Sequence, residues 1–163
     1  MSSARATYRP ASELVLERFL PYRLSTLSNR ISRAIAGAYE RRFNLTVPEW
    51  RVIAVLGRAG TLSARDIAEA TQMDKVAISR AVARLERAGR VRGETDAADA
   101  RRQLLRLTAR GAELHARIAP QALAYEQALL AALAPTERRA LDAILNKLAA
   151  AAQRIEAPMA DAP

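Results

Sequence analysis

The chain of 163 residues contains no cysteine and a single histidine, and only 4% of its residues are aromatic. Without cysteine it cannot form disulfides, thiolate metal sites or thiol-based redox sensors. One histidine with no spacing typical of metal ligands gives no metal site. The sequence also offers no nucleophile–base pair and no phosphate-binding glycine loop. We therefore expect neither enzymatic activity nor a cofactor.

Long hydrophobic runs are missing as well. No stretch approaches the roughly 20 apolar residues that span a bilayer, and the first residues lack an apolar signal core. We expect a cytoplasmic protein with no membrane partner. Alanine, leucine and arginine are abundant instead. Because these residues are strong helix formers, the composition predicts a mainly α fold, in a chain long enough for one domain with a core.

Positive charge is concentrated in one part of the chain. The net charge is +9, and residues 73–110 hold ten Lys or Arg against five Asp or Glu. A local excess of this kind favours a polyanionic partner such as DNA. The alternative is a merely solvated surface, because most arginines are exposed in any protein.

Hydrophobic periodicity divides the chain into helices. Residues 1–12 show no period and are expected to be disordered, as is the tail at 154–163. A helical pattern covers 14–42, where Pro21 either kinks the helix or restarts it. Another helix is expected from Thr108 to about residue 133, and a last one from Pro135. We assign residues 13–153 to a single domain.

Residues 62–108 are the most informative segment. Ser63 with Asp66 resembles a capping box for a short helix. Asp74 is a good N-cap for a second helix that stops at Gly89, with core positions at Val76, Val82 and Leu85. Two short strands, 91–94 and 103–107, flank a polar loop and predict a hairpin. The segment therefore predicts a winged helix-turn-helix, and the whole chain a mainly α fold with a small β-hairpin wing.

The second of these helices carries the candidate base contacts. The N-terminal part of a recognition helix faces base edges in the major groove. Arg80 can offer two donors to guanine, Lys75 and Ser79 can contact bases or phosphate, and Ala77 can lie against a thymine methyl. Arg84, one turn further, is either a phosphate contact or a structural ion pair. For each arginine the alternative is a solvated helix face.

The hairpin tip supplies a second candidate contact. An arginine suits a narrow minor groove because it is long, always charged and weakly hydrated. Arg101 is predicted to reach that groove, with Asp99 holding it extended; alternatively the two form only a surface pair. Ser63 and Arg102 complete the predicted DNA-contacting set.

The chain resembles the MarR family of dimeric winged-helix regulators over about residues 14–150. Three features carry the resemblance: the two-helix reading unit, the order of long helices around it, and a wing signature. The signature is Asp99-Ala-Arg101, then Leu104-Leu-Arg-Leu-Thr108 and Gly111. One departure is Ala83, where many members carry aspartate, and this leaves open how Arg84 is anchored.

The resemblance implies a homodimer held by residues 14–43 and 111–153, with a DNA-binding lobe at about 46–110. Alternatively, these helices simply pack on the same chain. Two-fold symmetry implies a pseudo-palindromic operator with half-sites about one helical turn apart. An enzyme-like role is not implied. The rival interpretations are a non-specific architectural DNA binder, an interaction protein that uses the fold without DNA, and a regulator controlled only by its abundance.

The resemblance also implies a small-molecule effector, because many members bind aromatic acids. The segment 20–30 with 48–51 resembles the branch that controls hydroxycinnamate or benzoate catabolism. We therefore expect a repressor released by a small aromatic carboxylate or its coenzyme A thioester. The predicted ligand-binding residues are Arg23, Ser28, Asn29, Tyr39, Trp50 and Arg51. Alternatively, Ser28 only bonds back to a helix carbonyl and Trp50 is ordinary core.

Overall fold

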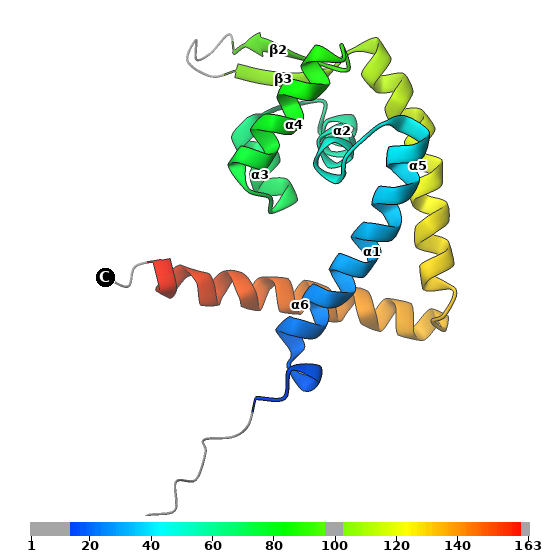
Figure 1. Cartoon of the computed structure of the whole chain (residues 1–163). Helices are drawn as coiled ribbons and strands as arrows, with labels where there is room; N and C mark the ends of the chain where they lie inside the picture. Colours follow the sequence, from blue (N-terminus) through cyan, green and yellow to red (C-terminus); the bar gives the residue numbers. More distant parts are fainter. Residues whose placement is uncertain (1–13, 97–102, 161–163) are drawn as a thin grey trace, which may run out of the picture. The chain divides into compact units, whose positions relative to one another are not determined.

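The computed structural model describes residues 14–96 and 103–160. These residues are mostly helical and contain one small antiparallel sheet (Figure 1), which confirms the predicted fold class. The elements are η1 (Leu16–Arg18), α1 (Leu20–Phe43), α2 (Val47–Ala59), β1 (Thr61–Ser63), α3 (Ala64–Thr71), α4 (Lys75–Arg87), β2 (Val91–Thr95), β3 (Gln103–Leu107), α5 (Ala109–Leu130) and α6 (Pro135–Ala160).

The chain divides into two compact units, the first ending at Leu114 and the second beginning at His115. The boundary falls within α5, so this helix contributes residues to both units. The first unit contains α1, the helix-turn-helix pair and the sheet. The second contains the rest of α5 and all of α6.

The core of the first unit lies where α2, α3 and α4 pack against one another. Ile53 and Leu56 of α2, Ile67 of α3, and Ile78 and Leu85 of α4 are each at most 1% exposed. They recur at helical spacing, so each helix turns one apolar stripe inward. This burial fixes α4, the predicted recognition helix, against two supporting helices.

Val76 is not part of this core, although the sequence pattern placed it there. Its side chain is 55% exposed, whereas Ile78 is 1% exposed. Val76 and Ile78 are two positions apart, which places them about 200° apart around the helix axis. Burial of Ile78 therefore turns Val76 outward. Val82 and Leu85 are buried as expected.

Prolines and capping residues set where the helices begin. Pro21 lies in the first turn of α1, so it restarts the helix rather than kinking it. Pro48 lies in the first turn of α2. There the Glu49 carboxylate accepts a hydrogen bond from the Thr46 backbone amide at 2.8 Å. Pro135 opens α6, as predicted.

The sheet has the order β1-β3-β2, with both neighbouring pairs antiparallel. The β2–β3 hairpin confirms the predicted strands. The third strand, β1, was not expected, because three residues between Gly60 and the start of α3 are too short to show a strand period. It pairs Thr61 with Arg106 and so joins the hairpin to the helices.

Thr108 links the end of α4 to the beginning of α5. Its hydroxyl donates to the Gly89 carbonyl at 2.7 Å and accepts from the Gly111 amide at 3.1 Å. Its amide donates to the Arg90 carbonyl at 3.1 Å. A Cβ atom at Gly111 would overlap that same carbonyl. The predicted cap at Thr108 is therefore confirmed, and this part of the wing signature has an architectural role.

The C-terminal helices differ from expectation at one boundary. Pro120 lies inside α5, which continues beyond it to Leu130. Helix α6 extends to Ala160, so the expectation of a disordered tail from residue 154 was wrong for 154–160. The strong helix formers at 149–154 prolong the helix past the predicted stop.

Candidate nucleic-acid interface

A tight turn joins α3 to α4 and defines the helix-turn-helix. Gln72 adopts the left-handed conformation (φ 51°) that ends α3. The Met73 amide then donates to the Ala68 carbonyl at 3.2 Å. Asp74 starts α4, because its carboxylate accepts from the amides of Val76 at 2.8 Å and Ala77 at 3.1 Å. The predicted N-cap is confirmed and fixes which residues form the first turn.

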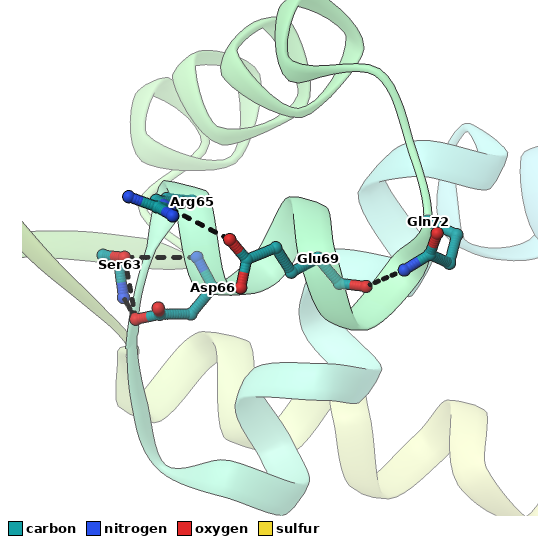
Figure 2. Close-up of polar contacts among 5 residues, drawn as sticks. All are labelled: Ser63, Arg65, Asp66, Glu69 and Gln72. Carbon is teal, nitrogen blue, oxygen red and sulfur yellow. Dashed lines mark hydrogen bonds and ion pairs between the residues drawn. The ribbon is translucent and has the colours of Figure 1, made fainter. Parts of the chain in front are cut away.

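Helix α3 is held by its own side chains (Figure 2). The Ser63 hydroxyl donates to the Asp66 carboxylate at 2.7 Å and accepts from the Asp66 amide at 3.2 Å, which confirms the capping box. Gln72 closes the other end by donating to the Glu69 carbonyl at 2.8 Å. Because Ser63 is buried and committed to this cap, its predicted contact with DNA would require the cap to rearrange.

An ion pair joins two residues on the exposed side of α3. Arg65 Nε donates to Glu69 Oε1 at 2.9 Å (Figure 2), one turn further along the helix. This hydrogen bond raises the pKa of the Arg65 guanidinium. Because both side chains are exposed, the pair contributes little to the stability of α3.

Helix α4 presents a basic face opposite its buried stripe. Ile78, Ala81, Val82 and Leu85 face the core. The exposed residues are Lys75, Val76, Ser79, Arg80, Ala83, Arg84, Glu86 and Arg87. Four of these are cations and one is an acid, so the face is net positive. Three of the predicted contacts, Lys75, Ser79 and Arg80, are thus brought together on one accessible surface.

Arg84 forms the structural ion pair that was one of its two predicted roles. Its guanidinium lies 3.7 Å from the Glu49 carboxylate of α2, whose side chain is only 8% exposed. Glu49 was missed as a site residue, although the Thr46-x-x-Glu49 spacing is a capping-box signature. This contact answers the question raised by Ala83: the partner of Arg84 comes from another helix.

A groove of about 240 Å³ separates α4 from the beginning of α2. It is lined by Thr46, Pro48, Glu49, Ala77, Arg80, Ala81 and Arg84. Ala77, predicted to meet a thymine methyl, is half-buried along this groove rather than on the exposed face. Arg80 and Arg84 lie at the groove and remain exposed.

Ion pairs link the two strands of the wing, β2 and β3. Glu94 of β2 pairs with Arg92 at 3.0 Å and with Arg106 of β3 at 2.6 Å. This cluster ties the two strands together below the tip. The predicted tip residues Asp99, Arg101 and Arg102 lie outside the described residues, and their contacts stay predictions.

The predicted ligand-binding residues fall into two groups. Tyr39 is buried against Trp50, with ring centroids 5.4 Å apart, and burial raises the pKa of the Tyr39 hydroxyl. Arg23, by contrast, lies in the exposed first half of α1. At 1.5 Å per residue, Arg23 and Tyr39 are about 24 Å apart along this helix. One small aromatic acid cannot contact both within a protomer.

Ser28 and Asn29 belong to the exposed group with Arg23, whereas half-buried Arg51 follows Trp50 on α2. A hollow of about 390 Å³ lies along the first half of α1; Arg23 lines it, whereas Ser28 and Asn29 are not among its lining residues. Its lining residues are Leu20, Arg23, Leu24, Thr26, Leu27 and Arg30. Leucines beside two guanidiniums suit a ligand with an apolar ring and a carboxylate.

Metal clusters and membrane-spanning helices are absent from the described part of the chain. Residues 14–96 and 103–160 contain no group of three or more His, Asp or Glu placed to hold a metal ion. None of the helices in the same ranges is long and apolar enough to cross a membrane.

The chain is similar to a known protein family and to several known proteins. Residues 43–102 match the model of the MarR family. A 75-residue stretch is 35% identical to the HTH-type transcriptional regulator FarR of Neisseria gonorrhoeae, covering 46% of this chain and 51% of FarR. The chain thus spans about half the length of this curated relative.

Two solved structures resemble the chain over nearly all of their length. A MarR/EmrR family transcriptional regulator from Acinetobacter sp. ADP1 is 28% identical with a TM-score of 0.81, covering 86% of this chain and 99% of that one. The PcaV transcriptional regulator of Streptomyces coelicolor, solved with its natural ligand, is 27% identical with a TM-score of 0.69, covering 87% and 99%.

Proposed function

The family match and the fold support a transcriptional regulator of the MarR family, and from that premise we propose that this protein is a sequence-specific repressor. It binds a pseudo-palindromic operator as a homodimer and leaves it when a small aromatic carboxylate, or its coenzyme A thioester, binds. The observation that carries the proposal is the basic face of α4, a helix whose first turn is capped by Asp74. A helix of this kind fits the major groove.

The homodimer is supported by apolar side chains that the chain leaves uncovered. Leu20, Leu24 and Leu27 of α1 are 40–52% exposed, and Ile144 and Leu145 of α6 are 47–52% exposed. Large apolar side chains exposed along a helix in this way are typical of an association site. A two-fold dimer would place two copies of α4 on successive turns of one DNA face, about 34 Å apart.

The effector is supported by the hollow along α1, where Arg23 and Arg30 accompany three leucines. The PcaV structure, similar to this chain, was solved with its natural ligand. Each group of predicted ligand residues contains one arginine, Arg23 or Arg51, but the hollow brings Arg23 together with a second guanidinium, that of Arg30. We therefore place the aromatic carboxylate beside Arg23.

DNA binding is tested by fluorescence anisotropy with the DNA upstream of the protein's own gene, in excess random competitor, from about 50 to 200 mM salt. Tight binding that resists competitor and weakens with salt is expected. Arg80→Gln should lose about 1–3 kcal/mol of binding free energy, whereas Arg139→Gln, an exposed arginine of α6, should bind as wild type. Binding abolished by competitor would favour the architectural alternative.

The effector is tested on the same complex. A panel of benzoate-type and hydroxycinnamate-type acids, and their coenzyme A thioesters, is titrated calorimetrically and then added to the protein–DNA complex. At least one compound should give a binding heat and lower the anisotropy of the labelled DNA. The Arg23→Gln substitution should weaken the binding of that compound. Absence of heat from every acid would contradict this effector and favour a regulator controlled by abundance.

A further inference from the structure

Val76 occupies an unusual position for a large apolar residue in the first unit. Among the described residues between Leu27 and Leu123, it is the one large hydrophobic side chain that is exposed. Elsewhere in that span such side chains are covered to a greater extent. Isolated exposed apolar residues are ordinary on protein surfaces, so its location decides whether this one matters.

That location is the middle of the exposed face of α4. At about 100° per residue, Val76 and Ala83 lie along the centre line of the face, seven residues apart. Lys75 and Ser79 lie to one side of this line, and Arg80 to the other. Polar and cationic side chains therefore flank Val76 on both edges, as the two phosphate backbones flank the floor of a major groove.

The first turn of α4 is fixed by an observed contact. The Asp74 carboxylate accepts from the Val76 amide itself at 2.8 Å. Val76 thus lies in the N-terminal turn, the part of a recognition helix that contacts base edges. A β-branched side chain in a helix also keeps essentially one rotamer, so the two Val76 methyl groups are already held in place.

We propose that Val76 contacts the 5-methyl group of a thymine in each operator half-site and determines specificity there. This inference rests on the proposed DNA-binding function. The thymine methyl is the apolar group that base pairs present in the major groove, and Val76 is the apolar group that α4 presents. Ala77 does not serve this role, because it is half-buried along the groove with Thr46 and Glu49.

The expected effect is modest and specific. Burial of one methyl-sized group changes an equilibrium about fourfold. Removing the methyl from the contacted thymine should therefore weaken wild-type binding about fourfold. The same removal should have no effect once the valine methyl groups are gone.

The test begins with selection of duplexes from a random pool by the full-length wild-type protein. Each thymine of the enriched duplex is then replaced in turn by deoxyuridine, which lacks only the 5-methyl group, and affinities are measured by anisotropy. One position per half-site should lose about fourfold. At that position Val76→Ala should bind the thymine and deoxyuridine duplexes equally, and Val76→Thr, which keeps one methyl, should retain part of the difference.

Lys75→Gln is the matched control on the same turn. This substitution should weaken binding to the thymine and deoxyuridine duplexes equally. It should also reduce the salt dependence of the affinity, as expected for a phosphate contact. Thermal unfolding of Val76→Ala should match wild type, which separates base readout from folding. Undiminished thymine preference in Val76→Ala, or no deoxyuridine effect in the wild type, would overturn the inference and leave the regulator intact. Failure to enrich any duplex would overturn the proposed sequence-specific function as well.

Discussion

The winged-helix region and the helices that flank it differ in how far their large apolar side chains are exposed. In the region from Tyr39 to Leu107, large side chains such as Leu45, Ile53 and Leu56 are at most 1% exposed. In the flanks, Leu27 is 52% exposed and Ile155 is 62% exposed. The first region covers its own core, whereas the flanks bury Leu114 and Ile118 but leave many of their large apolar side chains exposed.

This difference separates what one chain can do from what a pair of chains can do. Burying a leucine or isoleucine stabilises by about 1.5–3 kcal/mol. The winged-helix region gains that energy within a single chain, so its recognition helix is set before any partner arrives. The exposed apolar side chains of the flanks would gain it by association, which is the physical basis for the proposed homodimer.

The largest expected effect comes from opening the covered core. Leu85→Ala removes a side chain that is 1% exposed on the inner face of α4. A cavity there should lower the free energy of unfolding by about 2–5 kcal/mol, measured by urea denaturation. Val76→Ala on the outer face of the same helix should change it by less than about 0.5 kcal/mol. Equal effects from the two substitutions would break the comparison.

The uncovered flank should respond in association instead. Leu27→Lys places a charge, which proteins rarely bury, where the dimer is proposed to form. Losing one buried leucine would cost about 1.5–3 kcal/mol of association free energy, a tenfold or greater rise in the dimer dissociation constant by sedimentation velocity. Far-UV circular dichroism should keep its helical signal. A variant that stays as tightly associated as wild type would remove Leu27 from the proposed interface.

A smaller effect is expected where α5 meets the end of α4. Gly111→Ala would press a methyl group against the Arg90 carbonyl, which is fixed backbone. Overpacking of this kind costs about 1–3 kcal/mol, read from thermal unfolding. Ala112→Ser, at the exposed neighbouring position, is the control. If Gly111→Ala unfolds at the same temperature as the control, the close approach of Gly111 to the Arg90 carbonyl does not affect stability.

Local chemistry explains what the sequence could predict. The caps at Ser63, Asp74 and Thr108 depend on residues within three positions, and so do the helix starts at Pro21 and Pro135. These signals act over one turn, so a linear sequence displays them directly. They were enough to place the helix-turn-helix, and the hairpin followed from two short strands around a polar loop.

Contacts between distant elements explain what it could not. The exposure of Val76 depends on which stripe of α4 faces α2 and α3, and β1 exists because β3 pairs with it. The ligand candidates were collected by residue type, yet the helix separates Arg23 from Tyr39. Residue type alone does not show how far apart two side chains lie in the folded chain. The candidate DNA face was therefore predicted better than the candidate ligand site.

The smallest effect tests the link between α2 and α4 through Glu49. This carboxylate accepts from the Thr46 amide and lies 3.7 Å from Arg84. Glu49→Gln keeps an acceptor for the amide but removes the charge. Because the Arg84 side chain is 60% exposed, the lost attraction should be below about 1 kcal/mol. Glu49→Ala should cost about 1 kcal/mol more, since the cap is lost too.

A double-mutant cycle with Arg84→Gln isolates the ion pair from the cap. If Glu49 anchors Arg84, the Arg84→Gln substitution should cost less unfolding free energy in the Glu49→Gln background than in wild type. Equal costs in the two backgrounds would mean that the two side chains are neighbours without coupling. The recognition helix would then be held by its apolar stripe and by the Asp74 cap, with no contribution from the charge of Glu49.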